Sequence, residues 1–498
     1  IMNCRQITTF TVNGNAYPKT CKIPVTKEAD EPRHLESGVL NLYPQTTFQE
    51  IEGFGGAMTE SSAYLFLKMD EAVRKAALEE YFGKNGNHTR FVRVHMDSCD
   101  FSLEEYAAVE DPIADPELAT FSIKRDQKYI IPMLKEAMAI SKEPLEVLLS
   151  PWSPPAAWKT PPKKQQNDLA VYGALFGFEV EPVDYTKPSR CNGGSLKPEY
   201  YGAWAKYLVK FVQAYLDEGI PVTMMSIQNE SIAATNWDSC VWTAGEQKTF
   251  LRDYLYPEFE KAGLTKQVGI YIWDHNKERV LEYAQEILDE ETMSMVEGIA
   301  FHWYSGDHFE AVDLTKKCYP DKILMSSECC ALHEPGKAGI TGLFGDPKLP
   351  ETVETEDAFA YAHDLIGNLN AGMNRWIDWN LIVDKNGGPR HVPSGFAAPM
   401  IANEDGTYRK NLTFDFIAHF SRYILPGAKR IGFSKCDAEI EMTAAQNVDG
   451  SIVAVILNKT RTDCQYAIRL EGNVIRIRIP AYTLSTIVIE PQQEEKKK

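Results

Sequence analysis

The sequence predicts an α/β protein, a (β/α)8 TIM barrel with an associated all-β sandwich domain built from both chain ends. Two observations lead to this prediction. Between residues 51 and 400, eight short apolar runs alternate with amphipathic helical patterns. In the ranges 1–50 and 401–498, strand-like runs are separated by turn residues instead. Because alternating strands and helices form a parallel sheet, eight such units predict a catalytic barrel over 51–400.

The two flanking ranges are expected to pair with each other. The first contains alternating patches at 7–12 and 38–43, broken by Asn-Gly and Pro. After about residue 400 the helical patterns stop, and period-two or β-rich runs take over. These runs are 451–457, 466–470, 474–479 and 483–489. Such runs between turns are typical of strands, so we expect N-terminal strands over 1–50 to join a C-terminal β-sandwich over 401–498.

The barrel elements can be assigned in chain order. The expected strands are 51–56, 91–96, 145–150, 223–227, 268–273, 298–303, 323–326 and 375–379. The expected helices are 70–82, 126–140, 201–217, 278–288 and 357–369, with apolar residues at three- and four-residue spacing. An open doubly wound sheet is the alternative. It normally carries a phosphate-binding glycine turn, and the segment 53–56 lacks the third spaced glycine and the P-loop lysine.

Two of the apolar runs end on a glutamate. The run 223–227 leads into Gln228, Asn229 and Glu230, and the run 322–328 ends on Glu328. Either glutamate alone is more readily explained as a surface or capping residue. In a barrel, however, all strands end at one rim, where active sites lie. Two carboxylates at one rim can split a glycosidic bond, with retention at a separation of roughly 5 Å and inversion at roughly 6.5–9.5 Å.

Further polar and aromatic residues follow the predicted strands. Tryptophan and tyrosine rings suit the C–H faces of a sugar, and carboxylate, amide or imidazole groups can bond its hydroxyls. The candidate substrate-binding residues are Asp100, Trp152, Asn229, His302, Tyr304 and Trp379. Arg93, within the second strand, is a candidate supporting residue that would keep a neighbouring nucleophile ionised.

Composition excludes several classes of function. The chain has 52 Lys and Arg against 70 Asp and Glu, a net charge of −18, which argues against nucleic-acid binding. No apolar run reaches the roughly 20 residues that a membrane span needs, so no stable membrane insertion is expected. The ten cysteines show no metal-ligand spacing. No signal peptide is visible, which favours a cytoplasmic location, although secretion with a trimmed signal stays open, as does the oligomeric state.

A series of motifs runs along the chain at 52–60, 93–102, 150–155, 228–230, 300–304, 327–328, 376–381 and 387–389. Together they resemble glycoside hydrolase family 30, the family of acid β-glucosidase (glucosylceramidase). The segments 237–240 and 271–275 resemble its bacterial members in particular. The match follows the family order from about residue 50 to the C-terminal sandwich.

The resemblance implies a retaining β-glycosidase without metal or organic cofactor. It implies that Glu230 is the general acid/base, that Glu328 is the nucleophile, and that Asn229 contacts the sugar 2-hydroxyl. It further implies that Asp100, Trp152 and Trp379 hold the sugar and that Tyr304 lies beside the nucleophile. The chain departs from the family after Gly-Gly-Pro, where Ser394 replaces a sugar-binding Asn. The segment 161–195, rich in Lys, Pro and Gly, could also reshape the mouth of the barrel.

We therefore expect a retaining exo-acting β-glycosidase on β-glucosides or on related β-xylosides and β-fucosides. The alternatives are an endo-β-1,6-glucanase and a non-catalytic carbohydrate-binding protein. A Schiff-base enzyme would need a lysine at a strand end, and none of the eight expected ends has one. A lipid aglycone, and with it a role in sphingolipid metabolism, rests on family analogy alone.

Overall fold

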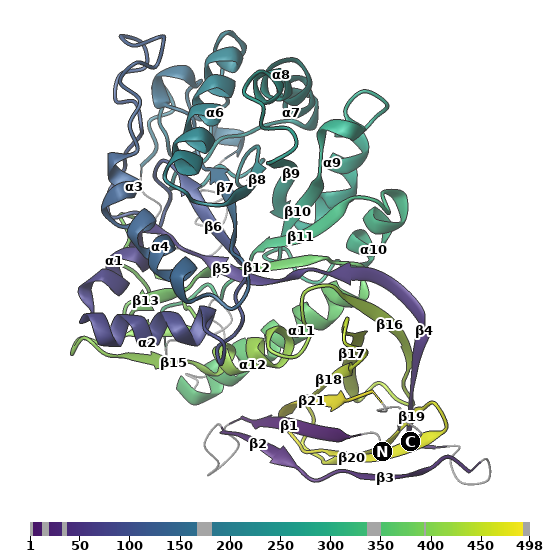
Figure 1. The fold of residues 1–498 in the computed structure, drawn as a ribbon. Helices are drawn as coiled ribbons and strands as arrows, with labels where there is room; N and C mark the ends of the chain where they lie inside the picture. The colour runs from purple at the N-terminus through teal and green to yellow at the C-terminus, as the bar shows by residue number, and fades with distance from the viewer. Residues whose placement is uncertain are drawn as a thin grey trace, which may run out of the picture.

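The computed structural model describes residues 3–11, 19–31, 37–166, 182–335, 350–392 and 395–491. Eight strands, each parallel to its neighbours, form a closed barrel, and helices surround it (Figure 1). The prediction of a (β/α)8 barrel is confirmed. In chain order the barrel strands are β5 (Gly53–Ala57), β6 (Phe91–Met96), β7 (Glu146–Pro151), β8 (Val222–Ser226), β9 (Gly269–Asn276), β10 (Gly298–His302), β11 (Ile323–Glu328) and β12 (Arg375–Asn380).

The inside of the barrel is filled by side chains from alternate strand positions. One buried cluster takes a residue from each of seven strands: Phe91, Leu148, Met224, Tyr271, Ala300, Met325 and Ile377. Because successive strand residues point to opposite faces, the positions between them pack against the helices. The interior is therefore solid, and a substrate can reach the barrel only at its rim.

The five expected helices are present, with two differences. The helix expected at 357–369 begins already at Pro350. The expected helix 126–140 is divided at Tyr129, whose φ is −126°. The reason is Pro132, which has no N–H to donate to the carbonyl of Lys128, so the helix restarts. The helices are α1 (Glu60–Lys68), α2 (Glu71–Phe82), α3 (Lys124–Lys128), α4 (Ile130–Ile140), α6 (Tyr201–Asp217), α7 (Ala244–Phe250), α8 (Tyr256–Lys261), α9 (Val280–Ile287), α10 (Phe309–Cys318), α11 (Pro350–Asn370) and α12 (Leu412–Ser421).

Several short helical segments complete the barrel layer. A π-helical turn, Leu251–Leu255, joins α7 to α8. The 3-10 turns are Ala156–Trp158, Lys164–Gln166, Pro198–Tyr200, Lys277–Arg279 and Met293–Met295. Helices α1, α7, α8 and α10 were not expected from the sequence. The Thr59 side chain accepts the N–H of Ser62 and so caps the first turn of α1, a local signal that propensity alone does not weigh.

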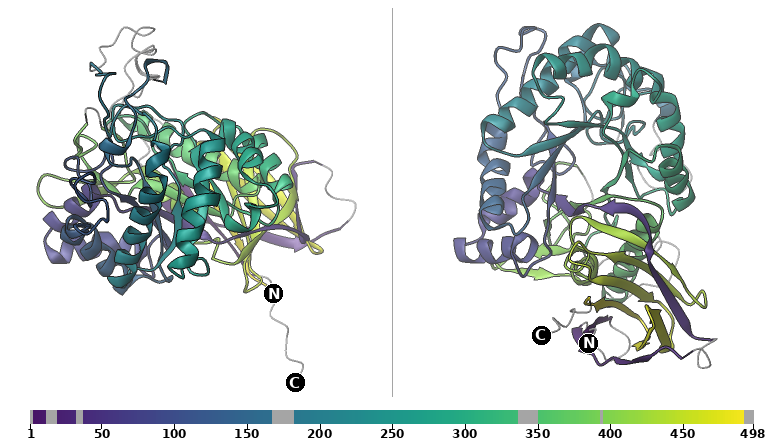
Figure 2. Two further views of the ribbon diagram at one scale, coloured as in Figure 1. Left: turned by 90° about the horizontal axis from the view of Figure 1, so that it is seen from above. Right: turned by 45° about the vertical axis from the view of Figure 1, so that its right-hand side comes forward.

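The sandwich contains strands from both chain ends, as predicted. Its ten strands lie in the order β2-β1-β21-β18-β17-β16-β4-β19-β20-β3, and β1 pairs with β21 so that Cys4 lies opposite Ile489. The long strand β4 runs from the sandwich to the first barrel strand (Figures 1 and 2). The strands are β1 (Cys4–Phe10), β2 (Lys19–Ile23), β3 (Thr26–Ala29), β4 (Val39–Ile51), β16 (Ala428–Ser434), β17 (Ile440–Gln446), β18 (Ile452–Asn458), β19 (Cys464–Leu470), β20 (Asn473–Ile479) and β21 (Thr483–Ile489).

The range 401–498 is not all β, which corrects the expectation for this part of the chain. A small sheet of β13 (Ile382–Asp384), β14 (Met400–Ala402) and β15 (Tyr408–Lys410) crosses position 400, and helix α12 follows it. The α12 side chain of His419 bonds Thr9 of β1 at 2.7 Å and Thr486 of β21 at 2.8 Å. Helix α12 therefore ties the barrel layer to the sandwich, and the first sandwich strand after it begins at Ala428.

No helix among the described residues combines the length and apolar content needed to cross a membrane.

Candidate active site

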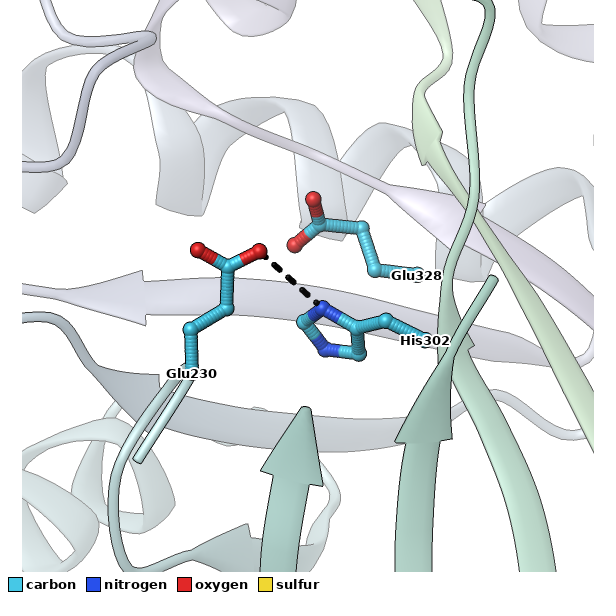
Figure 3. Close-up of side chains that lie close together, drawn as sticks. All are labelled: Glu230, His302 and Glu328. Atoms are coloured by element: carbon cyan, nitrogen blue, oxygen red, sulfur yellow. Dashed lines mark ion pairs between the residues drawn. The ribbon is translucent and has the colours of Figure 1, made fainter. Parts of the chain in front are cut away.

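The carboxyl groups of Glu230 and Glu328 meet at the rim of the barrel. Glu230 lies just after β8, and Glu328 is the last residue of β11. Their side chains point toward one another, with the His302 ring beside them (Figure 3). One oxygen of each glutamate and one nitrogen of His302 all lie within 4.8 Å of one another. Two strands nearly a hundred residues apart in sequence thus deliver a pair of carboxylates to one point.

The backbone at this point adopts an uncommon conformation. Glu230 has φ +51° and Asp274, at the end of β9, has φ +53°, both in the left-handed region. The N–H of Glu230 donates to the carbonyl of Asp274 at 2.7 Å. Non-glycine residues reach this region only when surrounding contacts hold them there, and such positions cluster at functional sites.

Arg93 connects the charged groups beneath the two glutamates. Its Nη1 donates to Glu328 Oε2 at 2.6 Å, and its Nη2 donates to Asn229 Oδ1 at 2.8 Å and to Asp274 Oδ2 at 2.9 Å. The guanidinium is fully buried and lies 4.8 Å from the ring centre of Trp152. Because arginine only donates, Asn229 must present its amide oxygen to Arg93, which leaves its NH2 group for another acceptor.

A second chain of contacts runs from Asp274 to Glu230 through His302. His302 Nε2 lies 2.9 Å from Asp274 Oδ1, and His302 Nδ1 lies 3.4 Å from Glu230 Oε1. Burial opposes the charged form of His302, but the neighbouring carboxylates, Glu328 foremost, raise the pKa of His302 to about 9. Burial also opposes the charged form of Asp274, yet Arg93 and His302 hold its pKa well below the usual range. His302 is therefore protonated and positively charged next to Glu230 at neutral pH.

The two glutamates lie among the same charged groups, so the protonation of one affects the other. Burial raises the pKa of Glu328, and the charges of His302 and Arg93 reduce that rise. Burial also opposes ionisation of Glu230, but His302 and Arg93 lower its pKa below the ordinary value. Tyr304 donates to Glu328 Oε1 at 2.8 Å, so Glu328 accepts two hydrogen bonds that favour its charged form. Glu230, Glu328 and His302 therefore bind and release protons as one coupled group, and no single residue holds the proton alone.

The same trio is the candidate metal site. In the described part of the chain, Glu230, His302 and Glu328 form the one group of three acidic, histidine or cysteine side chains close enough to share an ion. A metal ligand has to give up its proton, and His302 with a pKa of about 9 keeps its proton at neutral pH. A metal ion at this trio would therefore have to displace that proton.

Most of the predicted site residues lie around one cavity. It has a volume of about 450 Å³. Of the residues predicted from the sequence, Asp100, Trp152, Asn229, Glu230, Tyr304 and Glu328 line it. Trp379 stacks on Trp152 with ring centres 5.4 Å apart. His302 and Arg93 are buried behind the lining residues, and Ser394 lies outside the described residues.

Sequence reasoning did not assign roles to some residues that the structure brings to this site. Asp274 directly follows the predicted strand 268–273, and this place at a strand end is the signal that could have selected it. Asp274 also accepts from Ser226 Oγ at 2.6 Å and from Ser327 Oγ at 2.5 Å. Trp237 and Phe396 line the cavity from loops, and loop residues carry no periodic pattern that places them at a rim.

Comparison with known proteins agrees with this geometry. The profile described as glycosyl hydrolase family 30 TIM-barrel domain matches residues 51–424, and that of the family 30 beta sandwich domain matches residues 427–487. The lysosomal acid glucosylceramidase of Mus musculus is 29% identical over 442 residues, which cover 85% of this chain and 78% of the mouse protein.

Two solved structures are also similar over nearly the whole chain. SrfJ from Salmonella typhimurium has a TM-score of 0.85 and 29% identity, over 98% of this chain and all of the SrfJ chain. The endo-β1,6-glucanase BT3312 has a TM-score of 0.80 and 25% identity, over 98% of this chain and all of its own. With both family domains matched in order around a rim that holds two facing glutamates, the chain belongs to glycoside hydrolase family 30, a family of retaining glycoside hydrolases.

Proposed function

We propose that this protein is a retaining exo-acting β-glycosidase that hydrolyses β-glucosides or related β-xylosides and β-fucosides. The observation that carries the proposal is that one carboxylate oxygen of Glu230 lies within 4.8 Å of one carboxylate oxygen of Glu328. Retaining enzymes hold their carboxyl groups about 5–5.5 Å apart, whereas inverting enzymes leave about 6.5–9.5 Å for a water molecule. The short separation supports direct attack by one carboxylate on the sugar.

In the first step Glu328 is the nucleophile. Its carboxylate forms a bond to the anomeric carbon while the bond from that carbon to the aglycone oxygen breaks. Glu230 gives its proton to the departing oxygen, so the aglycone leaves as an alcohol. His302 Nδ1 lies 3.4 Å from Glu230 Oε1 and is the neighbouring group with which Glu230 shares its proton. Arg93 and Tyr304 hold Glu328 in place through their two hydrogen bonds.

In the second step the glycosyl–Glu328 ester is hydrolysed. Glu230, now ionised, takes a proton from a water molecule, and the water oxygen attacks the anomeric carbon. The bond to Glu328 breaks and the electron pair returns to its carboxylate. Two displacements at one carbon restore the original β configuration. Once Glu328 is esterified it no longer carries a negative charge. Glu230 then ionises more easily and can act as the base.

The residues around the glutamates support a sugar as the ligand. The NH2 group of Asn229, left free by Arg93, suits the 2-hydroxyl next to the anomeric carbon. Asp100 can accept from hydroxyls farther round the ring, and Trp152 offers an aromatic wall. Stacking of Trp379 on Trp152 fixes that wall. A cavity of about 450 Å³ lies toward the small end of ligand pockets, which favours one sugar with its aglycone.

Part of the cavity wall is apolar and suits an apolar aglycone. Ile232, Ala234 and Leu332 line it, and Leu332 is 41% exposed. Apolar walls gain from contact with an aryl or alkyl group and gain little from a second, hydrated sugar. The mouse relative is named as a glucosylceramidase, so a lipid β-glucoside, and a role in sphingolipid metabolism, falls within this proposal.

The test has two parts. A panel of aryl β-glycosides that differ only in the sugar should identify hydrolysed substrates, with the first product in the β configuration by NMR. Glu328→Ala should abolish turnover. Inversion of configuration, or full activity in Glu328→Ala, would contradict the mechanism. Inactivity on the whole panel beside measurable sugar binding would favour a non-catalytic carbohydrate-binding protein.

A second candidate is an endo-β-1,6-glucanase. It is favoured by the likeness of the whole chain to the endo-β1,6-glucanase BT3312. Product length from a β-1,6-glucan separates the two activities. Release of single glucose units from the first minutes supports exo action, and a series of short oligosaccharides supports endo action.

A further inference from the structure

Arg390 is a buried cation immediately behind the cavity. It follows the Gly-Gly-Pro segment after β12, and its side chain is 3% exposed. The guanidinium carbon lies 4.6 Å from the ring centres of both Phe101 and Phe396, and 5.8 Å from that of Trp237. Three aromatic rings therefore hold the guanidinium in one place.

The hydrogen-bond donors of Arg390 are unusual for a buried arginine. Within the described residues, none of its three side-chain nitrogens, Nε, Nη1 and Nη2, has a hydrogen-bond partner. A buried charge without partners is costly, so such a group is kept only where it interacts with another charge or serves a function. The opposite charge is Asp100, whose Oδ2 lies 3.5 Å from Arg390 Nη2.

Asp100 lies between Arg390 and the substrate space. Its side chain is 5% exposed and lines the cavity with Glu230 and Glu328, whereas the nitrogens of Arg390 are enclosed. Arg390 therefore cannot touch a sugar as the site stands. Any effect of Arg390 on the substrate has to pass through Asp100.

The contact between Arg390 and Asp100 affects the protonation of Asp100, because the other charges nearby are negative. Burial raises the pKa of Asp100 to about 7, and Arg390 is the foremost group that opposes the rise. The carboxylates that face Asp100 add to the rise: Glu328, Glu230 and Asp238. With the cation present, Asp100 is divided between its charged and neutral forms at neutral pH. Without it, Asp100 would lie buried among negative charges and would keep its proton.

We propose that Arg390 is a positioning residue for the sugar: it holds the Asp100 carboxylate at the cavity wall and favours its charged form, in which Asp100 accepts hydrogen bonds from sugar hydroxyls. A charged acceptor binds a hydroxyl about twice as strongly as a neutral one. The aromatic rings around Arg390 keep the cation from turning toward the substrate. This inference deepens the proposed function and rests on it for the identity of the ligand.

The first experiment measures Asp100 directly and needs no substrate. Protein labelled with ¹³C at the aspartate carboxyls is titrated by NMR, and the Asp100 signal is identified by its loss in Asp100→Asn. We expect the Asp100 titration to move to higher pH in Arg390→Met and to return toward the wild-type position in Arg390→Lys. Arg430→Met is the matched control, because Arg430 also stacks on a ring, Phe48 at 3.8 Å, but in the sandwich.

The second experiment is a double-mutant cycle on the best aryl β-glycoside. At neutral pH, Arg390→Met should lower kcat/KM by roughly ten- to a hundredfold, chiefly through a higher KM. The acid limb of the pH profile of kcat/KM should move to higher pH. In the Asp100→Asn background the same substitution should change kcat/KM by less than about threefold, since the residue through which Arg390 acts is gone.

The outcomes are separable from those of the proposed function. An unchanged Asp100 titration in Arg390→Met, or losses that simply add in the double mutant, would overturn the role of Arg390. Failure of the wild-type protein to hydrolyse any β-glycoside would overturn the proposed function, while the NMR titration still decides the link between Arg390 and Asp100.

Discussion

Arg93 donates a 2.6 Å hydrogen bond to Glu328, and both side chains are almost completely buried. The two residues come from β6 and β11, 235 positions apart in the chain. A buried carboxylate is stable in its charged form only if paired, and Arg93 provides the pairing in a fixed geometry. The ionised state of Glu328 therefore depends on this contact.

Arg93→Lys should lower kcat by about a hundredfold and change KM little, because a lysine cannot bond Glu328, Asn229 and Asp274 together in the same plane. Steady-state kinetics on an aryl β-glycoside measure the effect. Arg375→Lys is the control, since Arg375 begins β12 and bonds Tyr271 at 3.0 Å inside the barrel. An equal loss in both variants would show that general destabilisation is responsible.

Glu328→Ala should regain activity with added azide, which fits the space left by the carboxylate. Azide attacks the anomeric carbon from the same face, so the product is a glycosyl azide of inverted, α configuration. NMR of the product decides the assignment. A β-glycosyl azide from Glu328→Ala would mean that Glu328 is the acid/base and Glu230 the nucleophile.

Glu230→Ala should distinguish substrates by their leaving groups. With dinitrophenyl β-glycosides, whose leaving group needs no proton, the first step should stay fast. With phenyl or alkyl β-glycosides kcat/KM should fall by roughly 10²–10⁴-fold, the usual contribution of acid catalysis. Glu278→Ala is the control, because Glu278 lines the same cavity but is exposed. A uniform loss over all leaving groups would remove Glu230 from the acid role.

His302 should contribute a pH-dependent part of the free energy of unfolding. Its pKa of about 9 exceeds the value of roughly 6.5 in an unfolded chain, so the folded state holds the extra proton. The stabilisation, on the order of 3 kcal/mol, is fully present below about pH 6.5 and is lost as the pH rises through about 9. Chemical unfolding of wild type and His302→Gln across this range measures it.

His419 provides a control of opposite sign for that experiment. Burial lowers the pKa of His419 to about 3, so here the unfolded chain binds the extra proton. The difference between wild type and His419→Gln should therefore shrink as the pH falls below roughly 6.5. A pH-independent difference for His302→Gln would contradict the charged state of His302.

Gly55 in β5 should not tolerate a side chain. A Cβ atom there would lie 1.9 Å from the carbonyl oxygen of Phe91 in the neighbouring strand. We expect Gly55→Ala to lower the free energy of unfolding by about 3 kcal/mol or more. Gly202→Ala, on helix α6 with its nearest atom at 3.8 Å, should instead raise it by about 0.5–1 kcal/mol. Equal effects in denaturant titrations would refute the steric argument.

The sequence by itself determined the architecture and the two glutamates. Apolar periodicity is a local property, so the eight barrel strands, the helix at Tyr201–Asp217 and the pairing of both chain ends in one sandwich could be predicted from it. The end of a barrel strand also defines a place in space, because all ends meet at one rim. From that rule the sequence predicts that Glu230 and Glu328 lie close together at the rim.

Only the tertiary structure decided what surrounds them. Arg93 bonds three partners, Asp274 lies behind His302, and Phe101 and Trp237 enclose Arg390. These contacts join residues that are tens to hundreds of positions apart. Burial and charge at a few ångströms set the protonation of such groups, and neither quantity can be read from residue order. Helix α12 was missed for a related reason: its apolar faces are covered by α11 and β21, elements that are distant in sequence.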